Sequence, residues 1–118
     1  EVQERWEIKS MSRDTTFEED TSDTQIILKT LNALAEDVHK QLIKSNFNFK
    51  TATIKIRYEN FETHTHGKTL PFLTDRLSDI QRTVRDLTQT HLQQNRKVRL
   101  VGVKLSNLVS SEKQKKLV

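Results

Sequence analysis

Hydrophobic residues recur with two different periods along this chain, and the change of period limits what the chain can fold into. Between residues 52 and 58 every second side chain is apolar or aromatic, which is the period of a strand with one buried face. Residues 27–42 and 73–91 instead place apolar side chains at intervals of three or four, the period of an amphipathic helix. The sequence therefore predicts strand structure between two helices.

Both helices have recognisable starts. Ser22 and Gln25 have the spacing of a capping box, so the first helix is predicted over about residues 23–45. Thr74 is the predicted N-cap of the second helix, which should run to about Gln93.

Strands are predicted over residues 8–17, over 50–69 as a hairpin that turns at Glu59 and Asn60, and over 96–105. The order of elements is then β-α-β-β-α-β, an α+β fold with two helices on one face of a four-stranded sheet. Many unrelated modules share this order, so the order alone gives no function.

Composition excludes several classes of protein. The length of 118 residues suits one domain, and the absence of cysteine excludes disulfides and thiolate metal sites. No apolar run is long enough for a membrane span and no signal-peptide pattern opens the chain, so we expect a soluble intracellular protein without a membrane partner.

Charge is sorted by predicted element. The strand-like segments carry ten Lys or Arg and three Asp or Glu, a net charge of +7, whereas the two helix-like stretches, 18–49 and 70–95, carry −3. A basic sheet with a less basic helical back suits a polyanion laid across the strands.

Three segments resemble the little finger, or polymerase-associated, domain of Y-family translesion DNA polymerases, closest to the DNA polymerase IV branch. Residues 9–17 (KSMSRDTTF) resemble the opening strand of that domain, residues 61–71 (FETHTHGKTLP) its third strand, and residues 98–108 (VRLVGVKLSNL) its closing strand. All three occur in the family's order and are joined by two predicted helices. The resemblance covers nearly the whole chain.

The resemblance implies an antiparallel sheet in the order 1-4-2-3. It divides the chain into a connector from the thumb over residues 1–7, the little finger over 8–108 and a C-terminal tail over 109–118. It also implies a function: a non-catalytic DNA-binding module of a lesion-bypass polymerase. Such a module grips the phosphates of primer-template duplex in the major groove and tunes processivity and lesion preference.

Family contacts carried onto matching positions give a set of candidate DNA-binding residues, to which Lys68 is added because it lies near the exit of the third strand. The set is Ser10, Ser12, Arg13, Thr16, Thr63, Thr65, His66, Lys68, Arg99 and Lys104. Hydroxyl and cationic groups donate to phosphate oxygens without reading bases, as bypass of damaged bases requires. Some relatives have arginine where His66 stands, so this residue predicts weaker binding or a dependence on pH near neutrality.

No catalytic or metal-binding residue is predicted. His64 and His66 lie on one side of a strand and could be half of a metal site, but no third ligand is placed to complete it, so a solvent- or phosphate-facing edge is favoured. Residues 18–20 are three carboxylates in what is predicted to be a polar loop, without a phosphate cradle. In the family, magnesium belongs to the palm of the parent enzyme, which this chain lacks, so no cofactor is expected here.

The predicted partners are primer-template duplex DNA and the remaining polymerase domains. Gln114 and Leu117 resemble the start of a sliding-clamp-binding peptide whose aromatic end is missing, so a truncated or absent motif is favoured over a clamp site. Localisation is expected to be cytoplasmic and nucleoid-associated in a prokaryote, or nuclear in a eukaryote.

Two other functions stay open. A single-stranded RNA-binding module can have the same order of elements but stacks bases on aromatic residues of its central strands, and Phe61 is the one aromatic of the predicted third strand. A small hydrolase is the third, although no nucleophile with an adjacent base is recognisable.

Overall fold

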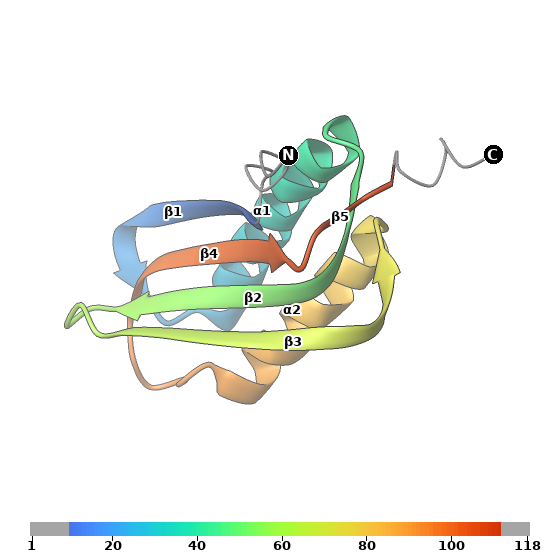
Figure 1. Ribbon diagram of the computed structural model, residues 1–118. Coiled ribbons are helices and arrows are strands. Elements are labelled where there is room, and N and C mark those ends of the chain that lie inside the picture. The colour runs from blue at the N-terminus through green and yellow to red at the C-terminus, as the bar shows by residue number, and fades with distance from the viewer. Residues whose placement is uncertain (1–9, 112–118) are drawn as a thin grey trace.

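Two helices cover one side of an antiparallel sheet in the computed structural model, which describes residues 10–111 (Figure 1). The elements follow the predicted order, with one short strand added at the end. They are β1 (Ser10–Thr21), α1 (Thr24–Lys44), β2 (Phe47–Tyr58), β3 (Thr63–Thr74), α2 (Leu77–His91), β4 (Val98–Ser106) and β5 (Val109–Ser110). The predicted connector over residues 1–7 lies outside the described residues, as do Gln114 and Leu117 of the tail.

The sheet order β1-β4-β2-β3 confirms the predicted order 1-4-2-3, and every pairing is antiparallel. The closing strand β4 therefore lies in the middle of the sheet, between β1 and β2, although it comes last of the four in the chain (Figure 1). The additional strand β5 pairs with the start of β2 at Phe47 and Asn48. At two residues it is too short to show a periodic pattern in the sequence.

The first helix begins one residue later than the capping box indicates. Its N-cap is Asp23, whose side chain accepts hydrogen bonds from the backbone N–H groups of Gln25 and Ile26. The prediction of Ser22 as the cap is therefore wrong. An ionised carboxylate also suits the positive end of the helix dipole better than a hydroxyl does.

The second helix begins at Leu77, and the prediction of Thr74 as its N-cap is wrong. Thr74 is the buried last residue of β3, and its hydroxyl donates to Asp79 Oδ2 at 2.7 Å and accepts from the Arg76 N–H at 3.1 Å. Thr74 therefore ties the end of β3 to the first turn of α2. The helix ends at His91, two residues before the predicted end.

The core lies between the helices and the sheet. The predicted helical stripe supplies Ile27, Leu31 and Val38 from α1, and the alternating residues of β2 supply Ile54 and Ile56, all of which are fully buried. Because α1 and α2 cover only one face of the sheet, no helix or strand among residues 10–111 covers the opposite face. That uncovered face is where a site can form.

Candidate nucleic-acid interface

The uncovered face, called the open face below, is lined by alternate residues of four strands. Residues directly opposite each other in an antiparallel pair point to the same side, and Ile54 and Ile56 point to the helices, so their neighbours in β2 point away. The residues of the open face are Ser10, Ser12, Asp14 and Thr16 of β1, Leu100, Gly102, Lys104 and Ser106 of β4, Thr51, Thr53, Lys55 and Arg57 of β2, and Thr63, Thr65, Gly67 and Thr69 of β3.

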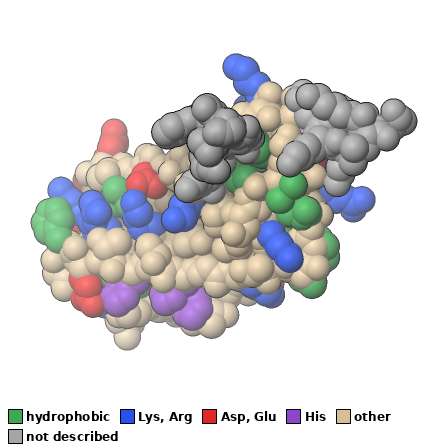
Figure 2. Space-filling model, viewed as in Figure 1, with side chains coloured by type: hydrophobic (Ala, Val, Ile, Leu, Met, Phe, Trp, Pro, Cys, Tyr) green, Lys and Arg blue, Asp and Glu red, His purple; other side chains and the backbone are tan. Residues whose placement is uncertain are grey.

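Hydroxyl side chains dominate the open face, and its charge is modest. Lys55, Arg57 and Lys104 are its cations and Asp14 its one carboxylate, which gives a net charge of +2. Figure 2 looks onto this face and shows a band of Lys and Arg side chains across it, with Asp and Glu nearby and histidines along the β3 edge. The remaining strand cations counted in the sequence therefore lie at the edges, on the helical side or outside the described residues.

Asp14 crosses the middle of the open face. Its Oδ2 lies 2.9 Å from Lys55 Nζ, so the side chain of β1 reaches over β4 to a residue of β2. Gly102 of β4 makes this possible, because a Cβ there would collide with the Asp14 carboxylate. Gly102 thus makes room for the Asp14 side chain.

A shallow hollow of about 190 Å³ surrounds this ion pair. Its lining comes from all four long strands, and six of the eight lining residues have polar side chains. The lining residues are Ser12, Asp14, Thr53, Lys55, Thr65, Gly102, Val103 and Lys104. A phosphate group entering this hollow would meet two ammonium groups and three hydroxyls, together with one carboxylate.

Six of the ten residues predicted to bind DNA share the open face: Ser10, Ser12, Thr16, Thr63, Thr65 and Lys104. Arg13, His66 and Lys68 do not, because their register partners are Val103, Ile54 and Ala52, which face the helices. The structure therefore gathers the predicted hydroxyls and separates three of the predicted cationic or imidazole groups from them.

Arg13 lies beside the first helix. It lines a second hollow together with Asp37, Lys40, Gln41 and Lys44 of α1, and its guanidinium donates to the Ser12 carbonyl at 3.1 Å. Because β1 is an edge strand, Arg13 lies at the rim of the sheet. Its guanidinium can contact a ligand on the open face only by reaching around that edge.

His66 packs against the second helix. Its ring is stacked on His91 with centroids 3.8 Å apart and an interplanar angle of 4°. Burial, followed by the charges of His91 and His64, lowers the pKa of His66, so the ring is mostly neutral at neutral pH. His91, the last residue of α2, is thus packed against β3.

His64 is engaged with a carboxylate rather than with a metal set. Its Nε2 lies 2.8 Å from Glu62 Oε2, and its ring meets Tyr58 edge-on. Among residues 10–111 no group of three or more His, Asp or Glu side chains is arranged to hold a metal ion. The carboxylates of residues 18–20 belong to the end of β1 and not to a loop, and Asp20 lies 3.7 Å from Arg99.

Arg99 lies in the bulge of β4 near the β2–β3 turn, and its guanidinium is 4.7 Å from the centre of the Phe61 ring. Phe61 itself belongs to this turn and not to the third strand, so its placement in that strand is wrong. Arg57 donates from Nε to Thr63 Oγ1 at 2.9 Å, and Lys55 pairs with Asp14. Sequence reasoning missed Asp14 and Thr53, although both follow from alternation in their strands.

Solved structures with the same fold include DNA polymerase chains and an isolated domain. DinB from Sulfolobus solfataricus matches with a TM-score of 0.74 and 23% identity, covering 86% of this chain and 29% of that chain. The little finger domain of PolIV, solved in complex with the beta-clamp processivity factor, matches with a TM-score of 0.68 and 19% identity over 82% of this chain and 86% of that chain. These matches give the class of the fold: a little finger domain.

Curated relatives agree with this class. "DNA polymerase IV" of Methanoculleus marisnigri is 44% identical over 108 residues, and "DNA polymerase IV 2" of Methanosarcina mazei is 38% identical over 118 residues. The chain spans about a third of the length of these relatives, 30% and 32%.

The model of the impB/mucB/samB family C-terminal domain matches residues 8–117, and the chain belongs to this family. It is a C-terminal domain of a protein of the DNA polymerase IV family, and the resemblance found in the three sequence segments is confirmed. No helix among residues 10–111 has the length and apolar character needed to cross a membrane.

Proposed function

We propose that this chain is the non-catalytic DNA-binding module of a lesion-bypass polymerase, and that primer-template duplex lies across its open face. The observation that carries the proposal is the composition of that face: hydroxyls in register on four strands, three cations and one carboxylate. Such groups donate hydrogen bonds to phosphate oxygens and fix the position of a duplex without reading its sequence. A grip of this kind tunes processivity and tolerates damaged bases.

The size of the sheet suits a major groove. Neighbouring strands lie about 4.8 Å apart, so the four long strands span roughly 14 Å from first to last. The major groove of B-DNA is about 12 Å wide, with a phosphate backbone on each side. The two rims of the sheet, β1 and β3, would then lie next to opposite DNA strands.

The RNA-binding alternative is disfavoured by the same face. Single-stranded RNA modules stack bases on aromatic side chains of the central strands. The open face of this chain has no aromatic residue on any of the four strands. The hydroxyl and cationic side chains of the open face suit contacts with phosphates instead.

Catalysis and its cofactor are assigned to the rest of the parent protein. We expect the palm, which this chain lacks, to supply the carboxylates that bind magnesium. The sliding clamp is a further proposed partner, supported by the PolIV little finger solved with the beta-clamp. Gln114 and Leu117, which resemble the start of a clamp-binding peptide, lie outside the described residues.

A salt titration of the 118-residue chain with fluorescent duplex DNA tests the proposal. Three cations on the open face predict that the logarithm of the association constant falls against the logarithm of salt concentration with a slope of about −3. The affinity should be similar for duplexes of unrelated sequence. Failure to bind any duplex at low ionic strength would contradict the proposal.

Asp14→Asn should strengthen DNA binding. The change removes the one carboxylate of the open face and releases Lys55, which it holds at 2.9 Å. Because the pair is partly exposed, we expect a modest gain of about two- to fivefold in affinity. The control is Asp86→Asn, which makes the same charge change on the exposed surface of α2. An equal gain in both variants would show that net charge, and not the open face, sets the affinity.

A further inference from the structure

The tip of the β2–β3 turn presents an aromatic ring to solvent. Phe61 is 63% exposed, the largest exposure among the large hydrophobic residues of the described chain. Its φ of 69° lies in the left-handed region, where a bulky side chain is unfavourable. In Figure 2 a hydrophobic side chain stands at the end of the sheet where Figure 1 draws this turn. An exposed aromatic ring on a strained backbone is a feature that is common at functional sites.

Backbone hydrogen bonds hold the turn in this conformation. The Phe61 N–H donates to the Tyr58 carbonyl at 2.8 Å, and the Tyr58 N–H donates to the Glu62 carbonyl at 2.9 Å. A third bond runs from the Glu59 N–H to the Lys97 carbonyl at 2.9 Å and ties the turn to the start of β4. The backbone at Phe61 is therefore held in this conformation by the turn itself.

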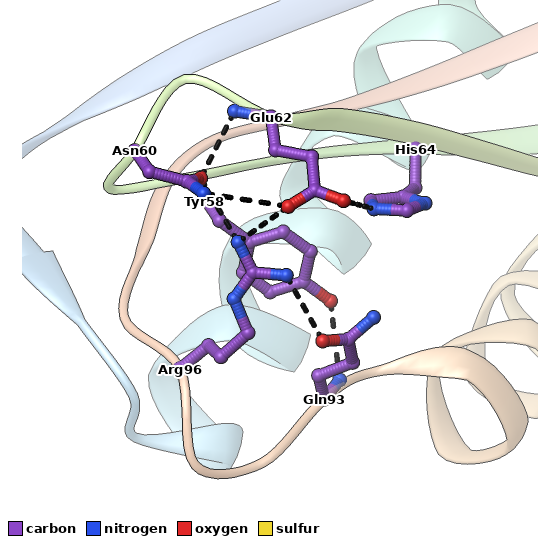
Figure 3. Close-up of polar contacts among 6 residues, drawn as sticks. All are labelled: Tyr58, Asn60, Glu62, His64, Gln93 and Arg96. Atoms are coloured by element: carbon purple, nitrogen blue, oxygen red, sulfur yellow. Dashed lines mark hydrogen bonds and ion pairs between the residues drawn. The ribbon is translucent and has the colours of Figure 1, made fainter.

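Side chains add a second set of ties, drawn in Figure 3. Arg96 lies over the Tyr58 ring, 4.1 Å from its centre, and donates from Nη2 to Asn60 Oδ1 and Glu62 Oε1, each at 2.9 Å. Hydrogen bonds from His64 and then Arg96 lower the pKa of Glu62 to about 2, so its carboxylate stays ionised over the working range of pH. These contacts surround the turn but leave Phe61 itself uncovered.

The neighbour of the Phe61 ring is a cation. The Arg99 guanidinium lies 4.7 Å from the ring centre, and its side chain is 41% exposed. The guanidinium thus lies over one face of the Phe61 ring and is a group that can donate to a phosphate. Arg99 precedes Leu100, which pairs with Arg57 at the end of the open face, and Phe61 lies in the turn that follows β2.

We infer that Phe61 and Arg99 form a stacking site for an unpaired base of a DNA strand that leaves the duplex. The inference rests on the proposed function, since the duplex on the open face would bring that strand to the turn. Bases inside a duplex already have both faces stacked, whereas an unpaired base offers one to Phe61. Arg99 would then hold the phosphate next to that base.

The test compares two DNA probes with the 118-residue chain: a blunt duplex and the same duplex with a single-stranded 5′ extension that contains 2-aminopurine. The wild-type chain should bind the extended duplex roughly five- to tenfold more tightly and quench the 2-aminopurine fluorescence. Phe61→Leu should lose both effects and bind blunt duplex as before, whereas Phe61→Trp should retain them. Phe72→Leu, which alters another exposed aromatic residue at the far end of β3, is the matched control and should behave as wild type.

The outcomes separate this inference from the proposed function. If blunt duplex binds but Phe61→Leu keeps both the preference and the quenching, the stacking site is wrong and the open face stands. If no duplex binds but single-stranded DNA is quenched in a manner that depends on Phe61, the stacking site stands without the proposed function. An equal loss on blunt and extended duplex would also overturn the stacking site.

Discussion

The double variant Lys55→Glu, Lys104→Glu should lose at least about 100-fold in affinity for duplex DNA at low salt. Both side chains line the central hollow of the open face, and reversing them changes the net charge of the face from +2 to −2. Each reversal removes a donor to phosphate and adds a repulsive charge, which costs several kcal/mol when like charges face each other. Fluorescence anisotropy with a labelled duplex measures the loss.

The control for this variant is Lys29→Glu, Arg85→Glu. Lys29 lies on α1 and Arg85 on α2, both exposed, so the control makes the same change in net charge on the helical side. We expect it to weaken binding by less than about tenfold, through long-range repulsion that salt screens. Comparable losses in the two variants would place the DNA elsewhere. Urea unfolding of both variants shows whether each still folds.

Ile54→Ala should lower the free energy of unfolding by about 2–5 kcal/mol. Ile54 lies in the middle of β2, is 0% exposed and is paired with Val103 of β4, so its loss leaves a cavity between the sheet and the helices. That amount is a large part of the stability of a domain of this size. The shift in the urea midpoint at constant slope measures the effect.

Thr53→Ala is the matched control, because it lies one residue away and points to the open face. It should cost less than about 1 kcal/mol, the range of strand propensity for a half-buried position. The pair of variants tests which face of β2 carries the core. A larger cost for Thr53 than for Ile54 would reverse the assignment of the two faces.

The sequence predicts the architecture well because periodicity records burial directly. The alternating residues of β2 are all buried, from Ala52 to Tyr58, and the α1 stripe from Ile27 to Leu42 is buried too. Such patterns survive because a shift of one residue would turn a whole face outward. The resemblance added the strand order, which no local pattern contains.

The candidate site is predicted less completely, because matching residues between relatives does not say which face they occupy. Arg13 lies two residues after the buried Met11, so alternation alone places it on the helical side. Alternation does not indicate the direction of His66 and Lys68, because β3 from Thr63 to Lys68 has no apolar residue to mark its inner face. Only pairing with β2 reveals their direction.

The two helix N-caps and the position of Phe61 are also predicted wrongly, for a physical reason. Neighbouring polar residues can each cap a helix, and hydrogen bonding in the folded chain selects Asp23 over Ser22. Thr74 looks like a cap because its hydroxyl does bind Arg76 and Asp79, but from the end of a strand. The left-handed backbone of Phe61 has no signal in its residue type.

Gly102 and Asp14 can be redesigned only together. Any side chain added at Gly102 occupies the space through which the Asp14 carboxylate reaches Lys55, so that carboxylate has to move and give up its partner. Protein engineers who want to place a new group at the centre of the sheet must therefore shorten Asp14 first. A side chain introduced at position 102, which carries no charge in this chain, would then change the affinity that we propose for the open face and DNA.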